Sequence, residues 1–233
     1  MKKYIPNGLT LLNLFCGCIA VIFVMNDNFI TAAFFVFLGI FFDFFDGFAA
    51  RKLNVKSELG VQLDSLADMV TSGLVPGLVV YKLLELSDLN WDELSLIPFL
   101  GLAITLASAY RLAKFNIDED QQTYFKGLPT PANALLILSL PLILEFQNND
   151  TINSIILNKW FLFVLTIISC YLLNSNIKLF ALKFKNYSFR ANATRYIFII
   201  LCLVLLIVLH FAAIPIIILL YIIMSVLDNL TSK

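Results

Sequence analysis

The sequence has little charge, a single histidine and no long polar linker, and each shortage excludes a class of protein. Only 14% of its 233 residues are charged, whereas 60% are hydrophobic, which is far from the balance of a soluble globular domain. The 16 Lys and Arg residues are offset by 16 Asp and Glu residues, so no overall basic field indicates nucleic-acid binding. We therefore expect an integral membrane protein that binds no nucleic acid.

Metal sites built from histidine and cysteine are excluded next. The one histidine is His210, and the four cysteines lie apart from it within apolar runs. Cysteines in such runs are small buried hydrophobic residues far more often than zinc ligands or disulfide partners. No low-complexity tract or repeat of soluble-array period divides the chain, so we expect one membrane-embedded domain over residues 1–233.

Long apolar runs, in contrast, are abundant. A spanning helix needs about 20 mostly apolar residues. Eight segments qualify, at residues 9–26, 29–50, 61–84, 94–115, 131–147, 159–176, 193–210 and 213–230. Two lysines precede the first run as in a signal peptide, but no clear cleavage site follows, so we expect a retained first helix. The predicted fold class is all-α, a bundle of about eight transmembrane helices.

The basic residues indicate the orientation of this bundle. With eight spans both termini lie on one side, and 14 of the 16 Lys and Arg residues then share that side, Lys82 and Lys159 being the exceptions. Basic residues gather on the cytoplasmic side of membrane proteins. We therefore predict a multi-pass protein of the cell membrane with cytoplasmic termini. An odd number of helices would break the asymmetry.

Four aspartates interrupt the second and third apolar segments. Asp43 and Asp46 are three residues apart near the end of the second segment, and Asp64 and Asp68 are four apart within the predicted first two turns of the third. Each pair therefore lies on one helix face, and the topology brings both pairs to the cytoplasmic edge. Four facing carboxylates repel one another unless a cation neutralises them, and Arg51 alone is too little. The alternative is that they are solvated at helix ends or paired with basic residues.

Oxygen ligands select hard divalent ions, so the four carboxylates predict a site for two Mg²⁺ or Mn²⁺ ions. Gly47, Ala50 and Gly60 lie on the same helix faces as the aspartates and let a backbone or a ligand approach closely. Written as spacing, the stretch from Asp43 to Asp68 is D-x-x-D-G-x-x-A-R-x8-G-x3-D-x3-D.

This pattern resembles, at every position, the signature of the CDP-alcohol phosphatidyltransferase family. The resemblance implies membrane helices that cradle a CDP-linked lipid at a dinuclear metal site, and it suggests a homodimer. It implies that all four aspartates ligate metal, with Asp68 also the base that takes the acceptor's proton. The residues implied to contact the cytidine and diphosphate are Gly47, Ala50, Arg51 and Gly60. "PNGLT" resembles the family's opening, so Asn7 and Thr10 are expected to frame the nucleotide, with helix capping as the alternative.

Two further segments bear on the acceptor alcohol. "SAYRLAKFN" (108–116) and "FKGLPTPAN" (125–133) resemble the phosphatidylserine synthase branch of the family, which implies CDP-diacylglycerol as donor and L-serine as acceptor. Arg111 is expected to pair with the serine carboxylate, because a guanidinium binds a carboxylate through two parallel hydrogen bonds. Asn116 or Asn133 would bind the ammonium or hydroxyl group.

Several alternatives stay open. Arg111, Lys114 and Lys126 could instead bind a phosphorylated acceptor, such as glycerol 3-phosphate or inositol phosphate. Arg111 and Lys114 could also only reach lipid headgroups and fix the topology, with "GLPTP" as a rigid connector. A divalent-cation transporter is the rival from another class, although its polar groups belong near the bilayer midplane. Direct transfer is favoured over a covalent intermediate, although Ser57 and Ser65 lie near the motif.

Overall fold

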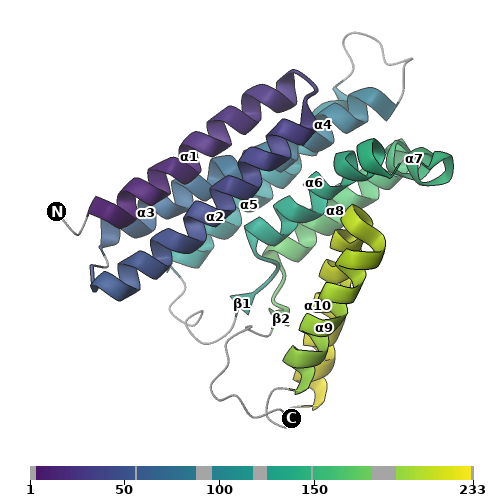
Figure 1. Ribbon diagram of the computed structural model, residues 1–233. Coiled ribbons are helices and arrows are strands. Elements are labelled where there is room, and N and C mark those ends of the chain that lie inside the picture. Colours follow the sequence, from purple (N-terminus) through teal and green to yellow (C-terminus); the bar gives the residue numbers. More distant parts are fainter. Residues whose placement is uncertain are drawn as a thin grey trace.

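The computed structural model describes residues 4–55, 57–87, 96–117, 125–147, 149–179 and 193–231. In this part the chain is a bundle of helices, and the one sheet is a two-stranded antiparallel pair, β1 (Phe125–Lys126) with β2 (Lys178–Leu179) (Figure 1). The all-α class is confirmed. The helices are α1 (Tyr4–Met25), α2 (Phe29–Leu53), α3 (Glu58–Asp68), α4 (Val75–Ser87), α5 (Ala103–Ile117), α6 (Thr130–Phe146), α7 (Asp150–Ile156), α8 (Lys159–Asn174), α9 (Ala193–Leu209) and α10 (Ala213–Thr231).

Side-chain caps fix the ends of the helices that carry the aspartates. The Asn28 side chain accepts a hydrogen bond from the Thr31 backbone N–H and starts α2, which ends at Asn54 in a left-handed conformation (φ 51°). The Ser57 hydroxyl accepts a hydrogen bond from the Gly60 N–H and starts α3 at Glu58, three residues earlier than the apolar pattern suggests. Asp68 is therefore the last residue of α3, and its prediction within the first two turns was wrong.

The helix does not stop at Asp68. A π-helical turn, η1 (Met69–Leu74), joins α3 to α4, so Glu58–Ser87 forms one continuous span of 30 residues. A π-helical turn holds more residues than an α-helical turn, and such turns are frequent at functional sites. Here the turn begins directly after the fourth aspartate.

The second half of the chain differs more from the expected pattern. A 3₁₀ helix, η2 (Ile97–Leu102), leads into α5. The predicted segment 159–176 is preceded by the short α7, and α7 and α8 together form a bent pair with an angle of 58°. Asn149 and Asn158 cap the starts of these two helices through their side-chain oxygens, which explains why the polar stretch is helical.

The C-terminal helices α9 and α10 meet at a 3₁₀ turn, η5 (His210–Ala212). Gln147, just after α6, holds this turn with both ends of its amide. Its Nε2 donates to the Leu209 carbonyl at 2.9 Å, and its Oε1 accepts from the Ala212 N–H at 2.8 Å. One side chain therefore docks the helical pair against α6.

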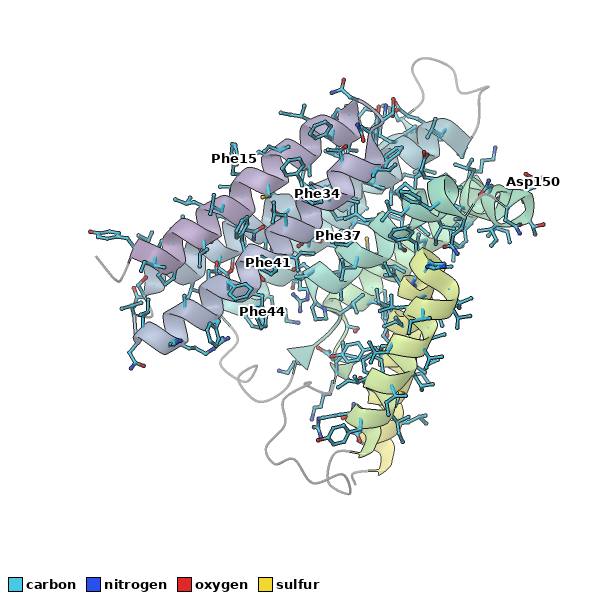
Figure 2. The ribbon with its side chains drawn as sticks, viewed as in Figure 1. Phe15, Phe34, Phe37, Phe41, Phe44 and Asp150 are labelled. Atoms are coloured by element: carbon cyan, nitrogen blue, oxygen red, sulfur yellow. The ribbon has the colours of Figure 1, made fainter. Side chains whose placement is uncertain are left out.

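The main hydrophobic core lies between α1, α2, α4, α6 and α8, where side chains such as Val24, Val36, Leu83 and Ile137 are fully buried. Large apolar side chains also cover the outside, including Phe15, Phe34, Phe41 and Phe44 along α1 and α2 (Figure 2). A protein apolar both inside and outside is suited to lipid rather than water.

Four stretches of the described residues are long and apolar enough to cross a membrane: Tyr4–Met25, Phe29–Leu53, Glu58–Ser87 and Arg195–Asn229. The bent pair α7 and α8 makes five if it counts as one span, and α6 is apolar but shorter, at 17 residues. The protein is therefore a multi-pass membrane protein with four or five candidate spans, and eight spans stay a prediction.

Candidate active site

Three of the four aspartates form a compact acidic cluster. One carboxylate oxygen each of Asp43 and Asp46 on α2 and of Asp64 on α3 lies within 4.8 Å of the other two. Asp46 is buried, and the other two are half-buried. We call these three residues the acidic triad. None of the three carboxylates forms an ion pair with a basic side chain in the part of the chain that the structure describes, and none is fully exposed, so neither basic pairing nor free solvation at a helix end accounts for the triad.

The triad suits a hard divalent ion by its chemistry. It offers oxygen ligands only, from two helices fixed by caps, and its like charges need a counter-charge. Thr10 from α1 donates its hydroxyl hydrogen to Asp46 Oδ2, which orients that carboxylate. This group of three close carboxylates could therefore hold a divalent metal ion.

Asp68 lies one turn beyond Asp64 and outside this three-membered group. Asn13 of α1 donates its Nδ2–H to Asp68 Oδ1 at 3.2 Å. The guanidinium of Arg111 on α5 lies close enough to act on Asp68 electrostatically. The sequence placed all four carboxylates in one cluster, whereas the structure has three together and the fourth beside them with its own partners.

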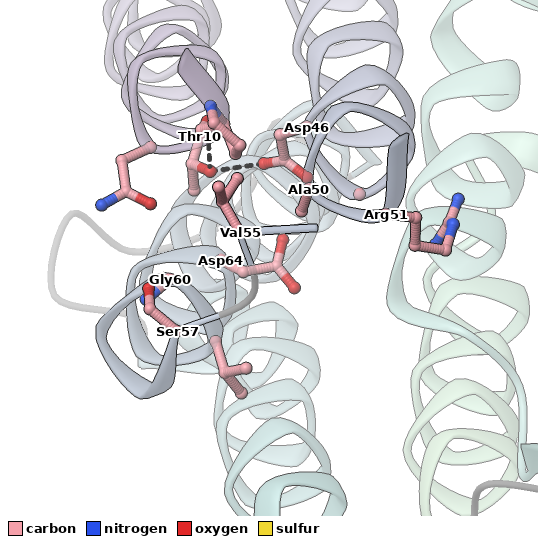
Figure 3. A pocket seen from close by; sticks show the side chains of 12 residues that line it. Thr10, Asp46, Ala50, Arg51, Val55, Ser57, Gly60 and Asp64 are labelled. Carbon is pink, nitrogen blue, oxygen red and sulfur yellow. Dashed lines mark hydrogen bonds between the residues drawn. The ribbon is translucent and has the colours of Figure 1, made fainter. Parts of the chain in front are cut away.

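A cavity of about 220 Å³ opens beside the triad between α1, α2 and α3 (Figure 3). Asp46 and Asp64 form part of its wall. All six residues expected at the nucleotide line it too, namely Asn7, Thr10, Gly47, Ala50, Arg51 and Gly60. Its remaining lining residues are Pro6, Val55, Ser57 and Val61, which sequence reasoning missed.

The packing around the cavity explains why asparagine, threonine and glycine occupy these positions of its wall. Asn7 and Thr10 lie inside α1 rather than at its start, so helix capping does not explain them. A Cβ at Gly60 would lie 3.2 Å from the Ser57 hydroxyl and 3.3 Å from Asn7 Oδ1, and one at Gly47 would lie 3.4 Å from the Arg51 guanidinium. Larger side chains would therefore crowd the cavity that glycine leaves open.

A family model, CDP-alcohol phosphatidyltransferase, matches residues 3–172 of the chain. The chain belongs to the CDP-alcohol phosphatidyltransferase family. It is therefore a membrane-bound transferase, as the aspartate signature predicted. The match covers the triad, the cavity, helices α1 to α7 and most of α8, whereas α9 and α10 lie beyond it.

Three relatives share the same name, CDP-diacylglycerol–serine O-phosphatidyltransferase. The Bacillus subtilis protein is 36% identical over 157 residues, which cover 66% of this chain and 81% of the relative. The Methanocaldococcus jannaschii protein is 34% identical over 152 residues (65% and 66%), and the Saccharomyces cerevisiae protein is 34% identical over 153 residues (59% and 53%). The predicted resemblance to the phosphatidylserine synthase branch is thus confirmed by the names of these relatives.

The five residues expected at the acceptor lie outside the cavity in this phosphatidyltransferase. Arg111 is buried, and its Nε has no hydrogen-bond partner among the described residues. Asn133 of α6 is fully buried, and its amide nitrogen and oxygen both lack such a partner in the same part of the chain. Lys114 on α5 and Lys126 on β1 are half-buried.

Asn116 already has a partner. Its Nδ2 donates to the Ser65 hydroxyl at 3.0 Å, and that hydroxyl lies 3.2 Å from Asn116 Oδ1, to which it can donate. The Ser57 hydroxyl is likewise engaged as the cap of α3. Both serines near the signature therefore have structural roles, which agrees with transfer without a serine nucleophile.

Proposed function

We propose that this phosphatidyltransferase moves the phosphatidyl group of CDP-diacylglycerol to L-serine and releases CMP. The observation that carries the proposal is that the cavity lined by the six expected nucleotide residues opens directly onto two triad carboxylates. The names of the three relatives support serine as the acceptor.

The donor's polar end fits this cavity. The cytidine and diphosphate would lie against Gly47, Ala50 and Gly60, whose small side chains leave room for them. Arg51, exposed at the cavity, would pair with a phosphate oxygen. The acyl chains would stay in lipid beside the apolar outer surfaces of α1 and α2.

Asp43, Asp46 and Asp64 would hold the divalent metal, with Asp68 as a further ligand in the two-ion arrangement. When bound, two Mg²⁺ or Mn²⁺ ions would neutralise the diphosphate and stabilise the entering and leaving oxygens of an in-line displacement. Thr10 would keep the Asp46 carboxylate in its orientation through the hydroxyl hydrogen bond.

The acceptor would be activated at Asp68. This carboxylate would accept the proton of the serine hydroxyl. At the same time the hydroxyl oxygen would bond to phosphorus, and the bond between phosphorus and the CMP oxygen would break. Arg111 would hold the serine carboxylate, since its guanidinium lies within electrostatic reach of Asp68. Asn133, whose buried amide has no hydrogen-bond partner among the described residues, would bind the ammonium or hydroxyl group, and Lys114, Asn116 and Lys126 stay predictions for the acceptor site.

The membrane setting is part of the proposal. The start of α1, the end of α2 and the start of α3 lie at the same end of the bundle (Figure 1), which supports a site on the side where α1 begins. A cytoplasmic face, a location in the cell membrane, eight spans, a single domain over residues 1–233 and a homodimer all stay predictions.

Release of CMP by the purified protein in detergent tests the proposal. The reaction would contain CDP-diacylglycerol, Mg²⁺ or Mn²⁺, and serine, glycerol 3-phosphate or inositol phosphate separately. We expect release that needs both metal and serine. Release with only a phosphorylated alcohol would replace the acceptor, and metal binding without release for any alcohol would favour the transporter.

A further inference from the structure

Asn13 is a buried polar residue in an apolar stretch of α1, and its side chain contacts a carboxylate of the site. It is fully buried, and its Nδ2–H donates to Asp68 Oδ1 at 3.2 Å. Its own Oδ1 has no hydrogen-bond partner among the described residues. An amide buried at such a cost needs a reason, because an unpaired buried polar atom is destabilising.

One hydrogen bond and two glycines shape the surroundings of Asn13. The Thr71 hydroxyl, in the π-helical turn η1, donates to the Asn13 backbone carbonyl at 3.1 Å. Gly39 of α2 leaves room for the amide, because a Cβ there would lie 2.8 Å from Asn13 Oδ1. Gly17 similarly admits Thr71, whose hydroxyl would clash with a Cβ at that position. α1, α2 and η1 therefore meet tightly around this one side chain.

The π-helical turn connects this packing to the site. Asp68 is the last residue before η1, and Thr71 is its third residue. The same short segment therefore presents a carboxylate to the Asn13 side chain and a hydroxyl to the Asn13 backbone. These two hydrogen bonds fix the position of Asp68 relative to Asn13 without any contribution from the triad.

We propose that Asn13 is a positioning residue for the transfer reaction. Its amide holds Asp68 Oδ1, so that Oδ2 is the oxygen left to take the proton of the acceptor hydroxyl. The inference rests on the proposed role of Asp68 as base. Thr10 orients Asp46 in the same way. Helix α1 therefore orients one carboxylate of the acidic triad through Thr10 and, one turn later, the carboxylate of the proposed base through Asn13.

Replacement of Asn13 by leucine tests this role, because leucine has a similar size and no donor. With the purified protein, CDP-diacylglycerol, serine and Mg²⁺, we expect kcat to fall about 10- to 100-fold, as for loss of a hydrogen bond to a charged group. KM for CDP-diacylglycerol should change less than about twofold, because the residues that line the cavity are intact.

The matched control is Asn174→Leu. The Asn174 amide donates to the backbone carbonyls of Ala107 and Cys170 and contacts no carboxylate. It should lower thermal stability and leave kcat within about twofold. An unchanged kcat in Asn13→Leu would overturn the inference, as would a fall in kcat with an equal loss of donor affinity, or an equal fall in the control.

Thr71→Val decides the question if Asn13→Leu does not fold. Valine keeps the shape of threonine and removes only the hydrogen bond to the Asn13 carbonyl, so we expect a fall in kcat of at least about threefold at constant donor KM. No change in kcat would overturn the inference. Failure of the proposed function is distinct, since the wild-type protein itself would then release no CMP with serine.

Discussion

Replacement of Asp43 by asparagine should change stability in opposite ways with and without metal. At an effective dielectric constant of about 20, two unit charges at the largest oxygen separation in the triad, 4.8 Å, repel each other by about 3.5 kcal/mol. Asp43 has two such neighbours in Asp46 and Asp64, which corresponds to about 7 kcal/mol of repulsion if all three carboxylates are ionised, and the variant loses the part of this repulsion that protonation and water do not already relieve. In EDTA the variant should therefore be at least as stable as the wild-type protein.

In Mg²⁺ the order reverses. An ion present at 100 times its dissociation constant stabilises a folded protein by about 2.7 kcal/mol, or roughly 5–10 °C for a chain of this size. Loss of one ligand charge should weaken Mg²⁺ binding at least about tenfold and remove much of this shift.

Thermal unfolding of the purified protein in detergent, with EDTA or with increasing Mg²⁺, measures both effects. Ser139→Ala is a suitable control, because that buried hydroxyl bonds only the Leu136 carbonyl of its own helix. A variant less stable than the wild-type protein in EDTA, with an undiminished Mg²⁺ shift, would refute the argument that the triad is a metal site held together against its own repulsion.

Three further predictions concern the base, the acceptor and the C-terminal helices. Asp68→Asn should fold and bind CDP-diacylglycerol normally, because Asn13 can still donate to the amide oxygen, whereas kcat should fall about 10²- to 10⁴-fold; wild-type turnover in a CMP-release assay would remove the assignment of the base. Arg111→Lys should raise KM for serine at least about tenfold, since lysine lacks the two-pronged pairing, with little change in KM for the donor; equal KM for serine would exclude this contact. Gln147→Leu should lower the unfolding free energy by about 1–3 kcal/mol at unchanged kcat, because two hydrogen bonds at the α9–α10 turn are lost; unchanged thermal stability would show that this amide does not dock the pair.

The aspartates and the cavity could be predicted because their pattern is local. Asp43, Asp46 and Asp64 lie on two consecutive helices joined by a short connection, so helix periodicity and this connection largely bring them together. The glycines that line the cavity have spacings fixed by the same two helices. The order of these residues along the chain thus largely determines the geometry of the acidic triad and of the cavity beside it.

The start of α3 and the position of α7 were missed although signals for both exist. Ser57 precedes the helix as a cap, and Asn149, followed by Asp150, marks a second start. The predicted helix starts followed the apolar runs, and these polar capping residues were not used to place them. Asn7, Thr10 and Asn13 recur at intervals of three residues in an apolar helix, so a polar stripe toward the site was also readable.

Other features depend on tertiary contacts that no local pattern reveals. The π-helical turn η1 has no periodicity of its own, and the partner of Asn13 is 55 residues away. Gln147 bonds backbone groups 62 and 65 residues away. Asp68 was expected among equivalent carboxylates, whereas packing of α1 against η1 gives it separate partners.

The most direct test of the proposed function follows the acceptor into the product. Purified wild-type protein would be given CDP-diacylglycerol, Mg²⁺ and isotopically labelled serine, and lipid and nucleotide would be quantified together. We predict labelled phosphatidylserine and CMP in equal amounts, and neither in EDTA. CMP without label in the lipid, or label in the lipid in the absence of divalent metal, would contradict a metal-dependent transfer to serine at the acidic triad.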